Sequence, residues 1–217
     1  PGSPEFLTDK ITFGPFQGQM FLGDQMQSNI YRIDSQVVDG QEQGVAIPFA
    51  EGLKSGAVRL RFNPADSSLW IGQTGRGWRA QGGANYSLQR IVYDPKVAVD
   101  AIQTVKVTNQ GFDIHFTQPQ TGADESKNIH CESWYYRNSP EYGSPVLGKR
   151  QEKVLSSSWN QAKTICHITL DHFELKKGKT EDSARVYRLN LANTAFGKKH
   201  GPFFAKAYYT LHKIPNK

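Results

Sequence analysis

The sequence predicts an all-β protein, and composition and spacing both favour this fold class. Of its 217 residues, 12% are aromatic and 20 are glycine, which combines strand-forming side chains with frequent turns. Between residues 10 and 94, strand-like runs recur about every eight to twelve residues, as is typical of all-β domains. Turn signals such as Asp39-Gly40 and Asn63-Pro64 separate them, and no run in this half has helical periodicity.

The chain divides into three segments. Residues 1–6 are typical of a cloning-vector remainder and are set aside from fold reasoning. The strand rhythm of 7–98 ends around Asp94–Ala101, where we place a domain boundary. Residues 99–217 have the size and strand number of a two-sheet, immunoglobulin-like sandwich.

The strand signals follow in chain order. In the first segment we expect strands at Ile11–Phe13, Gln19–Leu22, Asn29–Ile33, Gly44–Phe49, Val58–Phe62, Leu69–Ile71 and Leu88–Tyr93. In the second segment we expect them at Ile102–Val107, Gly111–Phe116, Ser133–Tyr136, Thr164–Leu170, Arg185–Leu191 and Ala207–Leu211.

The first segment contains an internal repeat. The run MFLGDQ followed by IYRI matches LWIGQT followed by LQRI, with Gly23 and Gly72 lying 49 residues apart. That period is close to the roughly 40–50 residues of one four-stranded propeller blade. We therefore interpret 7–98 as part of a β-propeller.

The second copy of the repeat has nine additional residues between its glycine and its arginine, which form a loop rich in glycine. This loop carries Arg76, Trp78 and Arg79, whose side chains can donate hydrogen bonds or stack. An insertion on one face of a repeated scaffold is a candidate binding surface. A simple hairpin extension is the equal alternative.

Several function classes receive little support. The net charge is +6, but the basic residues are dispersed, and Lys176–Lys179 and Lys198–His200 are interpreted as hairpin tips, so we expect no nucleic-acid binding. No apolar run approaches the roughly 18 residues of a membrane helix. No Cys-x-x-Cys-His run is present for a c-type haem.

The cysteines and histidines predict no metal site. Cys131 and Cys166 each have a neighbouring histidine, but their spacing is not that of a zinc site. The sequence allows two states for this pair: one disulfide or two buried thiols. In the aromatic run around Trp134, we expect Trp134 and Tyr136 in the core and Tyr135 exposed; sugar stacking by exposed rings is the alternative.

The motifs GDQMQSNIYR, AVRLRFNPADSSLWIGQTGRGWRAQGG, LQRIVYD, FDIHFTQP, WYYR, YGSP and AYYTLHKIP occur in this order along nearly the whole chain. In these motifs the chain resembles the C-terminal part of bacterial exported glucose/sorbosone dehydrogenase-like proteins. Such proteins are quinoprotein-type β-propellers, often fused to a cytochrome c domain and ending in an immunoglobulin-like sandwich. The resemblance implies the last blades of a propeller followed by that sandwich, in the periplasm or secreted.

The resemblance also implies ligand-facing loops at Asp24–Ser28 and Gln73–Asn85. Asp24, Gln25 and Gln73 would then line the ligand, Arg76 and Arg79 would bind a quinone carboxylate or a sugar hydroxyl, and Trp78 would stack on a ring. Pyrroloquinoline quinone and calcium would belong to the parent protein, with no cofactor held by this chain alone. The early-blade histidine base of such proteins has no counterpart, since the first histidine is His115.

Two functions follow as hypotheses. In the first, the chain is part of a sugar or aldose dehydrogenase, supplies ligand-facing loops and a support domain, and is inactive alone. In the second, it is a carbohydrate- or protein-binding module without redox activity. Because two blades taken from a ring expose sheet faces, we also expect either self-association or packing of the blades against the sandwich.

Overall fold

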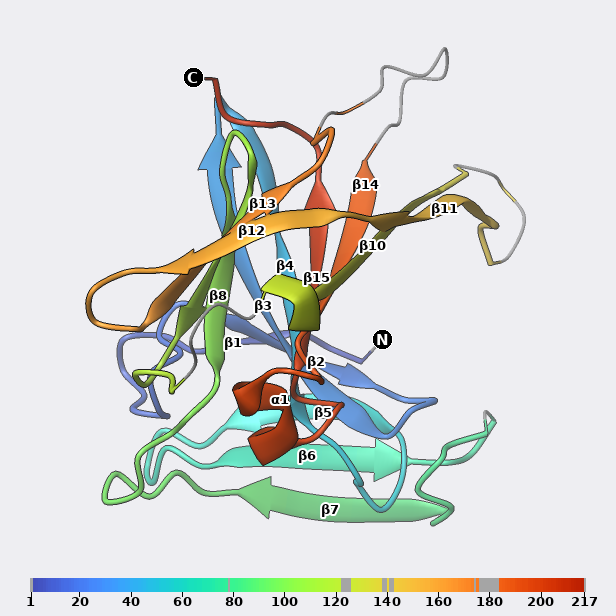
Figure 1. Cartoon of the computed structure of the whole chain (residues 1–217). Helices are drawn as coiled ribbons and strands as arrows, with labels where there is room; N and C mark the ends of the chain where they lie inside the picture. Colours follow the sequence, from blue (N-terminus) through green and yellow to red (C-terminus); the bar gives the residue numbers. More distant parts are fainter. Residues whose placement is uncertain are drawn as a thin grey trace. The chain divides into compact units, whose positions relative to one another are not determined.

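The computed structural model describes residues 2–77, 79–121, 126–137, 140, 143–173, 175 and 184–216. Within them the prediction of an all-β chain is confirmed, because the strands form three antiparallel sheets and only one short α-helix is present (Figure 1). Trp78 and the basic run Lys176–Lys179 fall outside the described residues. No helix in the described part has the length and apolar character needed to span a membrane.

The chain forms two compact units. Unit 1 contains Pro1–Asp34 and Ala46–Asp100, and unit 2 contains Ser35–Val45 and Ala101–Lys217. The sequence analysis assigned Ser35–Val45 to the first segment, whereas the structure groups this hairpin end with unit 2.

Unit 1 is built from two antiparallel sheets. In the first sheet the strands follow the order β1–β2–β3–β4, and in the second they follow β5–β6–β7 (Figure 1). The strands are β1 (Glu5–Phe6), β2 (Met20–Asp24), β3 (Asn29–Val38), β4 (Gln41–Ala50), β5 (Ala57–Phe62), β6 (Leu69–Thr74) and β7 (Tyr86–Ile91). The residues interpreted as a vector remainder thus supply an edge strand.

The sequence repeat is reproduced in strand register. Gly23 pairs with Ile30 between β2 and β3, and Gly72 pairs with Leu88 between β6 and β7. Arg32 lies opposite Phe21, as Arg90 lies opposite Trp70. The nine additional residues therefore lie in the β6–β7 loop and leave the pairing of the strands unchanged.

Aromatic rings fill the core of unit 1. The ring of Phe21 lies 5.0 Å from that of Phe49 and 5.3 Å from that of Phe62, both nearly perpendicular, which is the favoured geometry for aromatic pairs. Phe13 adds a third partner 5.1 Å from Phe62. Residues 11–13 are not a strand, so the prediction of one there is wrong: Phe13 is apolar because it packs in this cluster.

Arg32 is an arginine buried in this core. Its guanidinium lies 3.8 Å from the ring centre of Phe16 and donates a hydrogen bond to Gln19. Burial lowers the pKa of Arg32 to about 9, and nearby Asp34 opposes that shift. The group therefore stays charged at neutral pH, stabilised by an aromatic face and an amide oxygen.

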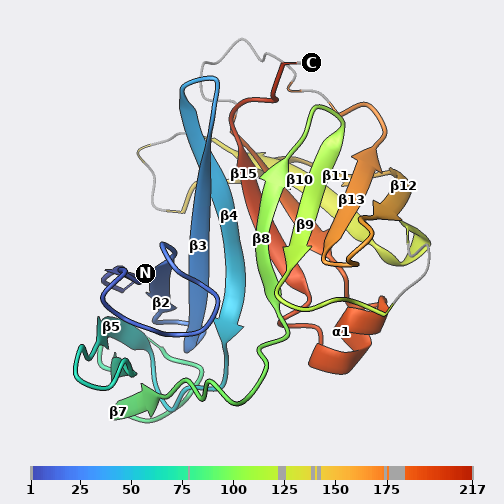
Figure 2. The same ribbon diagram turned by 90° about the vertical axis from the view of Figure 1, so that its left-hand side faces the viewer.

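Unit 2 consists of two sheets packed face to face. One is the continuation of the β1–β2–β3–β4 sheet, which has eight strands in all and continues in the order β4–β15–β14–β10–β11; the other has the order β12–β13–β9–β8 (Figure 2). The elements are β8 (Ile102–Val107), β9 (Gly111–Phe116), a 3₁₀ turn (Ser126–Asn128), β10 (His130–Tyr136), β11 (Val146–Glu152), β12 (Val154–Trp159), β13 (Ile165–Leu170), β14 (Arg185–Asn190), α1 (Ala195–His200) and β15 (Lys206–Leu211). Phe112 of one sheet packs 5.3 Å from Tyr187 and 5.1 Å from Tyr209 of the other.

Three features of unit 2 differ from the sequence prediction. β11 and β12 were not predicted, and Lys198–His200 form the last turn of α1 rather than a hairpin tip. Thr194 caps the N-terminus of this helix, because its hydroxyl accepts a hydrogen bond from Gly197 N. Trp134 is half-buried while Tyr135 and Tyr136 are both exposed, so the expected burial of Tyr136 is wrong.

Replacing the two repeat glycines by alanine is expected to affect stability differently at each position. A Cβ on Gly23 would lie 2.7 Å from Ala57 O, whereas one on Gly72 would lie 3.5 Å from Arg59 Cβ, an ordinary contact. We expect Gly23→Ala to destabilise unit 1 by about 1–3 kcal/mol through overpacking. Gly72→Ala should be neutral or slightly stabilising. Chemical denaturation followed by tryptophan fluorescence would measure both, and equal effects would contradict the assigned packing.

Candidate functional site

Three loops of unit 1 are joined by backbone hydrogen bonds into one group, which we call the loop cluster. Among the described residues it comprises 25–28 between β2 and β3, 51–56 between β4 and β5, and 75–77 and 79–85 between β6 and β7. Gln81 N donates to Met26 O over 2.9 Å, and Leu53 N donates to Ser28 O over 3.1 Å. The β2–β3 and β6–β7 loops, which the sequence identified separately, therefore form one surface.

Two glycines permit this close approach of the loops. A Cβ on Gly56 would lie 2.4 Å from Gln25 O, and one on Gly82 would lie 2.2 Å from Leu53 O. Both distances are far below van der Waals contact and involve backbone atoms, which cannot simply rotate away. The glycine content of the β6–β7 loop thus has a structural reason that is independent of any ligand.

Gln73 supports the loop cluster from within. Its side chain is buried, its Oε1 accepts a hydrogen bond from Ser55 N over 2.8 Å, and its Nε2 donates to Gln89 Oε1 over 2.9 Å. The same Gln89 oxygen accepts from Lys54 N. In this arrangement Gln73 fixes the β4–β5 loop through its amide.

Asp24 ends β2, Gln25 begins the β2–β3 loop, and both are half-buried. Asp24 Oδ1 accepts a hydrogen bond from Gln27 N over 2.9 Å, which closes the turn locally. Gln25 lies against Gly56 through its backbone oxygen and its Cγ. Both residues therefore shape the loop.

Arg76 and Arg79 are the predicted site residues that remain available to a ligand. Both are exposed, and among the described residues neither guanidinium has a hydrogen-bond or ion-pair partner. The loop beneath them is held by Gly75 N donating to Asn85 O and by Arg76 N donating to Thr74 Oγ1. The loop cluster thus presents two fixed-charge donors on an anchored backbone, a pattern suited to carboxylates or to vicinal hydroxyls.

The residues present are a poor fit to calcium. A calcium ion takes six to eight oxygen ligands, usually with several carboxylates. Within the described residues, no group of three or more His, Cys, Asp or Glu side chains is placed to hold a metal ion. The Asp24 carboxylate already closes its own turn.

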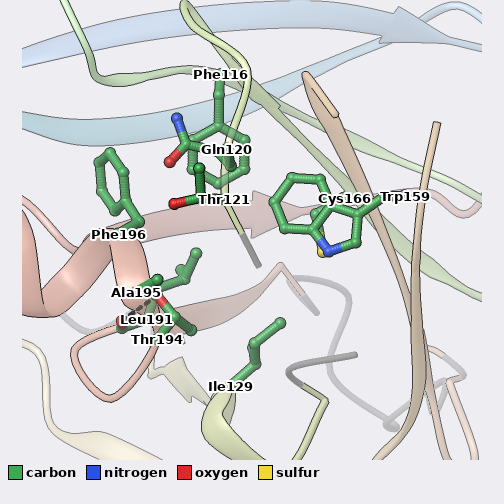
Figure 3. A pocket seen from close by; sticks show the side chains of 10 residues that line it. All are labelled: Phe116, Gln120, Thr121, Ile129, Trp159, Cys166, Leu191, Thr194, Ala195 and Phe196. Carbon is green, nitrogen blue, oxygen red and sulfur yellow. Dashed lines mark hydrogen bonds between the residues drawn. The ribbon is translucent and has the colours of Figure 1, made fainter. Parts of the chain in front are cut away.

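A small hollow in unit 2 was not predicted from the sequence. It is small, and Figure 3 shows Phe116, Trp159 and Phe196 arranged around it with Cys166 at its side. Its residues come from β9, β12, β13 and α1 and from the segments beside them, so spacing along the sequence gave no signal for it.

Both cysteines are buried and neither forms a disulfide, which decides between the two alternatives left open by the sequence. Burial raises the pKa of the Cys131 thiol, and the carboxylates of Glu152 and Glu132 raise it further. Cys131 is therefore an inert core residue rather than a nucleophile.

In unit 2 the buried carboxylate of Glu132 is paired with two cationic side chains. Burial alone would raise the pKa of this carboxyl, but hydrogen bonds from Lys149 and Arg188 outweigh that effect and lower it. Lys149 Nζ lies 3.0 Å from Glu132 Oε2. The two cations and one carboxylate form a structural ion-pair network.

Comparison with known proteins identifies no family: no family model, no curated protein and no solved structure matches the chain.

The internal role of Gln73 predicts a loss of stability on truncation. Gln73→Ala leaves Ser55 N without its acceptor in a buried position, so we expect a cost of about 1–3 kcal/mol. Gln81→Ala is the matched control, because Gln81 is exposed and contributes its backbone N–H to the loop cluster. Thermal unfolding should show a lower midpoint for the first variant only; two equal midpoints would assign Gln73 no supporting role.

The buried thiols predict slow labelling. With an aromatic disulfide reagent at pH 8, we expect almost no reaction of Cys131 or Cys166 in the folded protein and full reaction in guanidinium chloride. The raised pKa of Cys131 suppresses the thiolate, and burial blocks access. Rapid labelling of the folded chain would contradict this placement.

Proposed function

We propose that the loop cluster is a ligand-binding end of a sugar dehydrogenase-like propeller protein, to which this chain contributes binding and support but no turnover. In this proposal the two sheets of unit 1 are consecutive propeller blades, and unit 2 is an immunoglobulin-like support domain. The observation that carries it is the convergence of repeat-equivalent loops, one of which holds the exposed Arg76 and Arg79.

The geometry supports binding more than catalysis. Chemistry on a sugar needs a base within hydrogen-bond reach of the reacting hydroxyl. The described loop cluster contains no histidine, and its carboxylate is that of the exposed Glu51. The Asp24 carboxylate beside it, at the end of β2, is occupied by Gln27 N. Redox chemistry in quinoproteins belongs to the cofactor, and the protein's part is to bind and orient it.

Arg76 and Arg79 provide the binding chemistry in this proposal. A guanidinium can donate two parallel hydrogen bonds to a carboxylate, which fixes both the distance and the plane of the ligand. The carboxylates of pyrroloquinoline quinone and of aldonic acids are therefore the groups that this loop recognises. Trp78, between the two arginines in sequence, would add stacking on a ring, as the sequence analysis expects.

The test is isothermal titration of this chain with pyrroloquinoline quinone, gluconate and glucose. We expect the carboxylated ligands to bind, and Arg76→Ala to weaken them at least tenfold, because a charge-assisted hydrogen bond contributes about 1.5–3 kcal/mol. Arg137→Ala, which removes an exposed arginine of unit 2, is the matched control and should bind as the unmodified chain does.

Several results would contradict the proposal. The absence of binding, or equal weakening by the Arg76 and Arg137 variants, would remove the loop cluster as the site. Reduction of a redox dye by this chain with a sugar would overturn its assignment as non-catalytic. Retention on a neutral polysaccharide without carboxylate binding would instead favour a carbohydrate-binding module.

A further inference from the structure

The two sheets of unit 1 pack face to face, and the two faces in contact are not equivalent in the repeat. The face of the first sheet that carries Phe21, Gly23 and Ile30 packs on the face of the second that carries Leu60 and Phe62. Phe21 and Ile30 are 0% exposed, and a Cβ on Gly23 would lie 2.7 Å from Ala57 O.

The equivalent face of the second sheet is open. By the shared register, Trp70, Gly72 and Leu88 take the places of Phe21, Gly23 and Ile30. Leu88 is 66% exposed and the neighbouring Tyr86 is 79% exposed. We call Trp70, Gly72, Leu88 and Arg90 the open face of the second sheet.

The first sheet has a complementary open face on its other side. β1 pairs with β2 as β5 pairs with β6, so Phe6 takes the place of the buried Phe62. Phe6 is 59% exposed, and it belongs to residues 1–6, the segment that the sequence indicates is a cloning-vector remainder. Met20 and Leu22 lie on the same face and are half-buried, whereas their equivalents Leu69 and Ile71 are fully buried. We call Phe6, Met20 and Leu22 the open face of the first sheet.

We propose that the open face of the second sheet binds the open face of the first sheet of a second copy of this chain. The contact repeats between molecules the sheet packing already present inside each one, with Leu88 in the role of Ile30 and Phe6 in the role of Phe62. Because the two faces differ, the association is head-to-tail and can continue to a third copy. It does not depend on the ligand proposed for the loop cluster.

Charge favours this pairing over a symmetric one. Arg59, Arg61 and Arg90 all lie on the open side of the second sheet and are exposed. Arg61 pairs with Glu5 and Arg90 pairs with Asp66, whereas Arg59 donates to the neutral Ser3 hydroxyl, so these residues together leave a net positive charge. Two such faces placed against each other would oppose these cations, which is unfavourable. The first sheet offers instead an apolar face with the Asp24 carboxylate at the end of β2.

The experiment is sedimentation velocity of the chain over a hundredfold range of concentration, with single and mixed variants. We expect concentration-dependent association that Leu88→Glu and Phe6→Glu each weaken at least tenfold, because a carboxylate would be buried without a partner. Val97→Glu is the matched control, since Val97 is 61% exposed in unit 1 outside both open faces, and it should associate normally.

The decisive measurement is the sedimentation of a mixture of the two variants. Each variant keeps the face that the other has lost, so an equimolar mixture of Leu88→Glu and Phe6→Glu should form a dimer that stops at two chains. Unchanged thermal unfolding of both variants would show that their folds are intact, as expected for exposed positions. A chain that stays monomeric throughout, equal weakening by Val97→Glu, or a mixture that forms no dimer would each overturn the proposal.

Discussion

The close approach of two sheets at Gly23 is the constraint on which unit 1 depends. Only a residue without a side chain lets β2 come within contact of the Ala57 backbone, and this approach brings the rings of Phe21 and Phe62 to 5.3 Å. Because β2–β3 and β6–β7 share one register, their loops emerge at the same end. The loop cluster is thus a consequence of how the sheets pack, and its geometry needs no ligand to hold it.

Local patterns predicted most strands but missed those whose residues lack a pattern. The repeat containing Gly23 and Gly72 was visible because both copies keep the same apolar and glycine positions. β11 reads Val-Leu-Gly-Lys-Arg-Gln-Glu and is largely exposed, so no buried face marks it in the sequence. Conversely, residues 11–13 resemble a strand because Phe13 serves the aromatic core. An apolar residue indicates that its position is buried, but buried positions occur in loops as well as in strands.

Some features of the candidate site could likewise be predicted from the sequence, and others could not. The exposure of Arg76 and Arg79 follows from a polar, glycine-rich loop, which is a local property of the sequence. The internal role of Gln73 depends on Ser55 and Gln89, both 16 or more residues away, and no local rule specifies such partners. The hollow beside Trp159 is likewise made by segments that meet only in the folded chain. Sequence reasoning therefore locates candidate donors, and the fold decides which of them are already engaged.

Ligand contact and sheet stacking use different parts of unit 1, and this separation has a consequence for binding. The loop cluster lies at the strand ends, while the open faces lie on the flat sides of the sheets. Head-to-tail stacking would then place successive loop clusters along one edge without covering them. Each cluster would repeat the same pair of arginines, so a polymeric ligand with regularly spaced carboxylates would gain effective concentration from the second site onward. A short ligand with one carboxylate would gain no affinity from the second site. The difference in affinity between a long and a short ligand would therefore report how many chains have stacked.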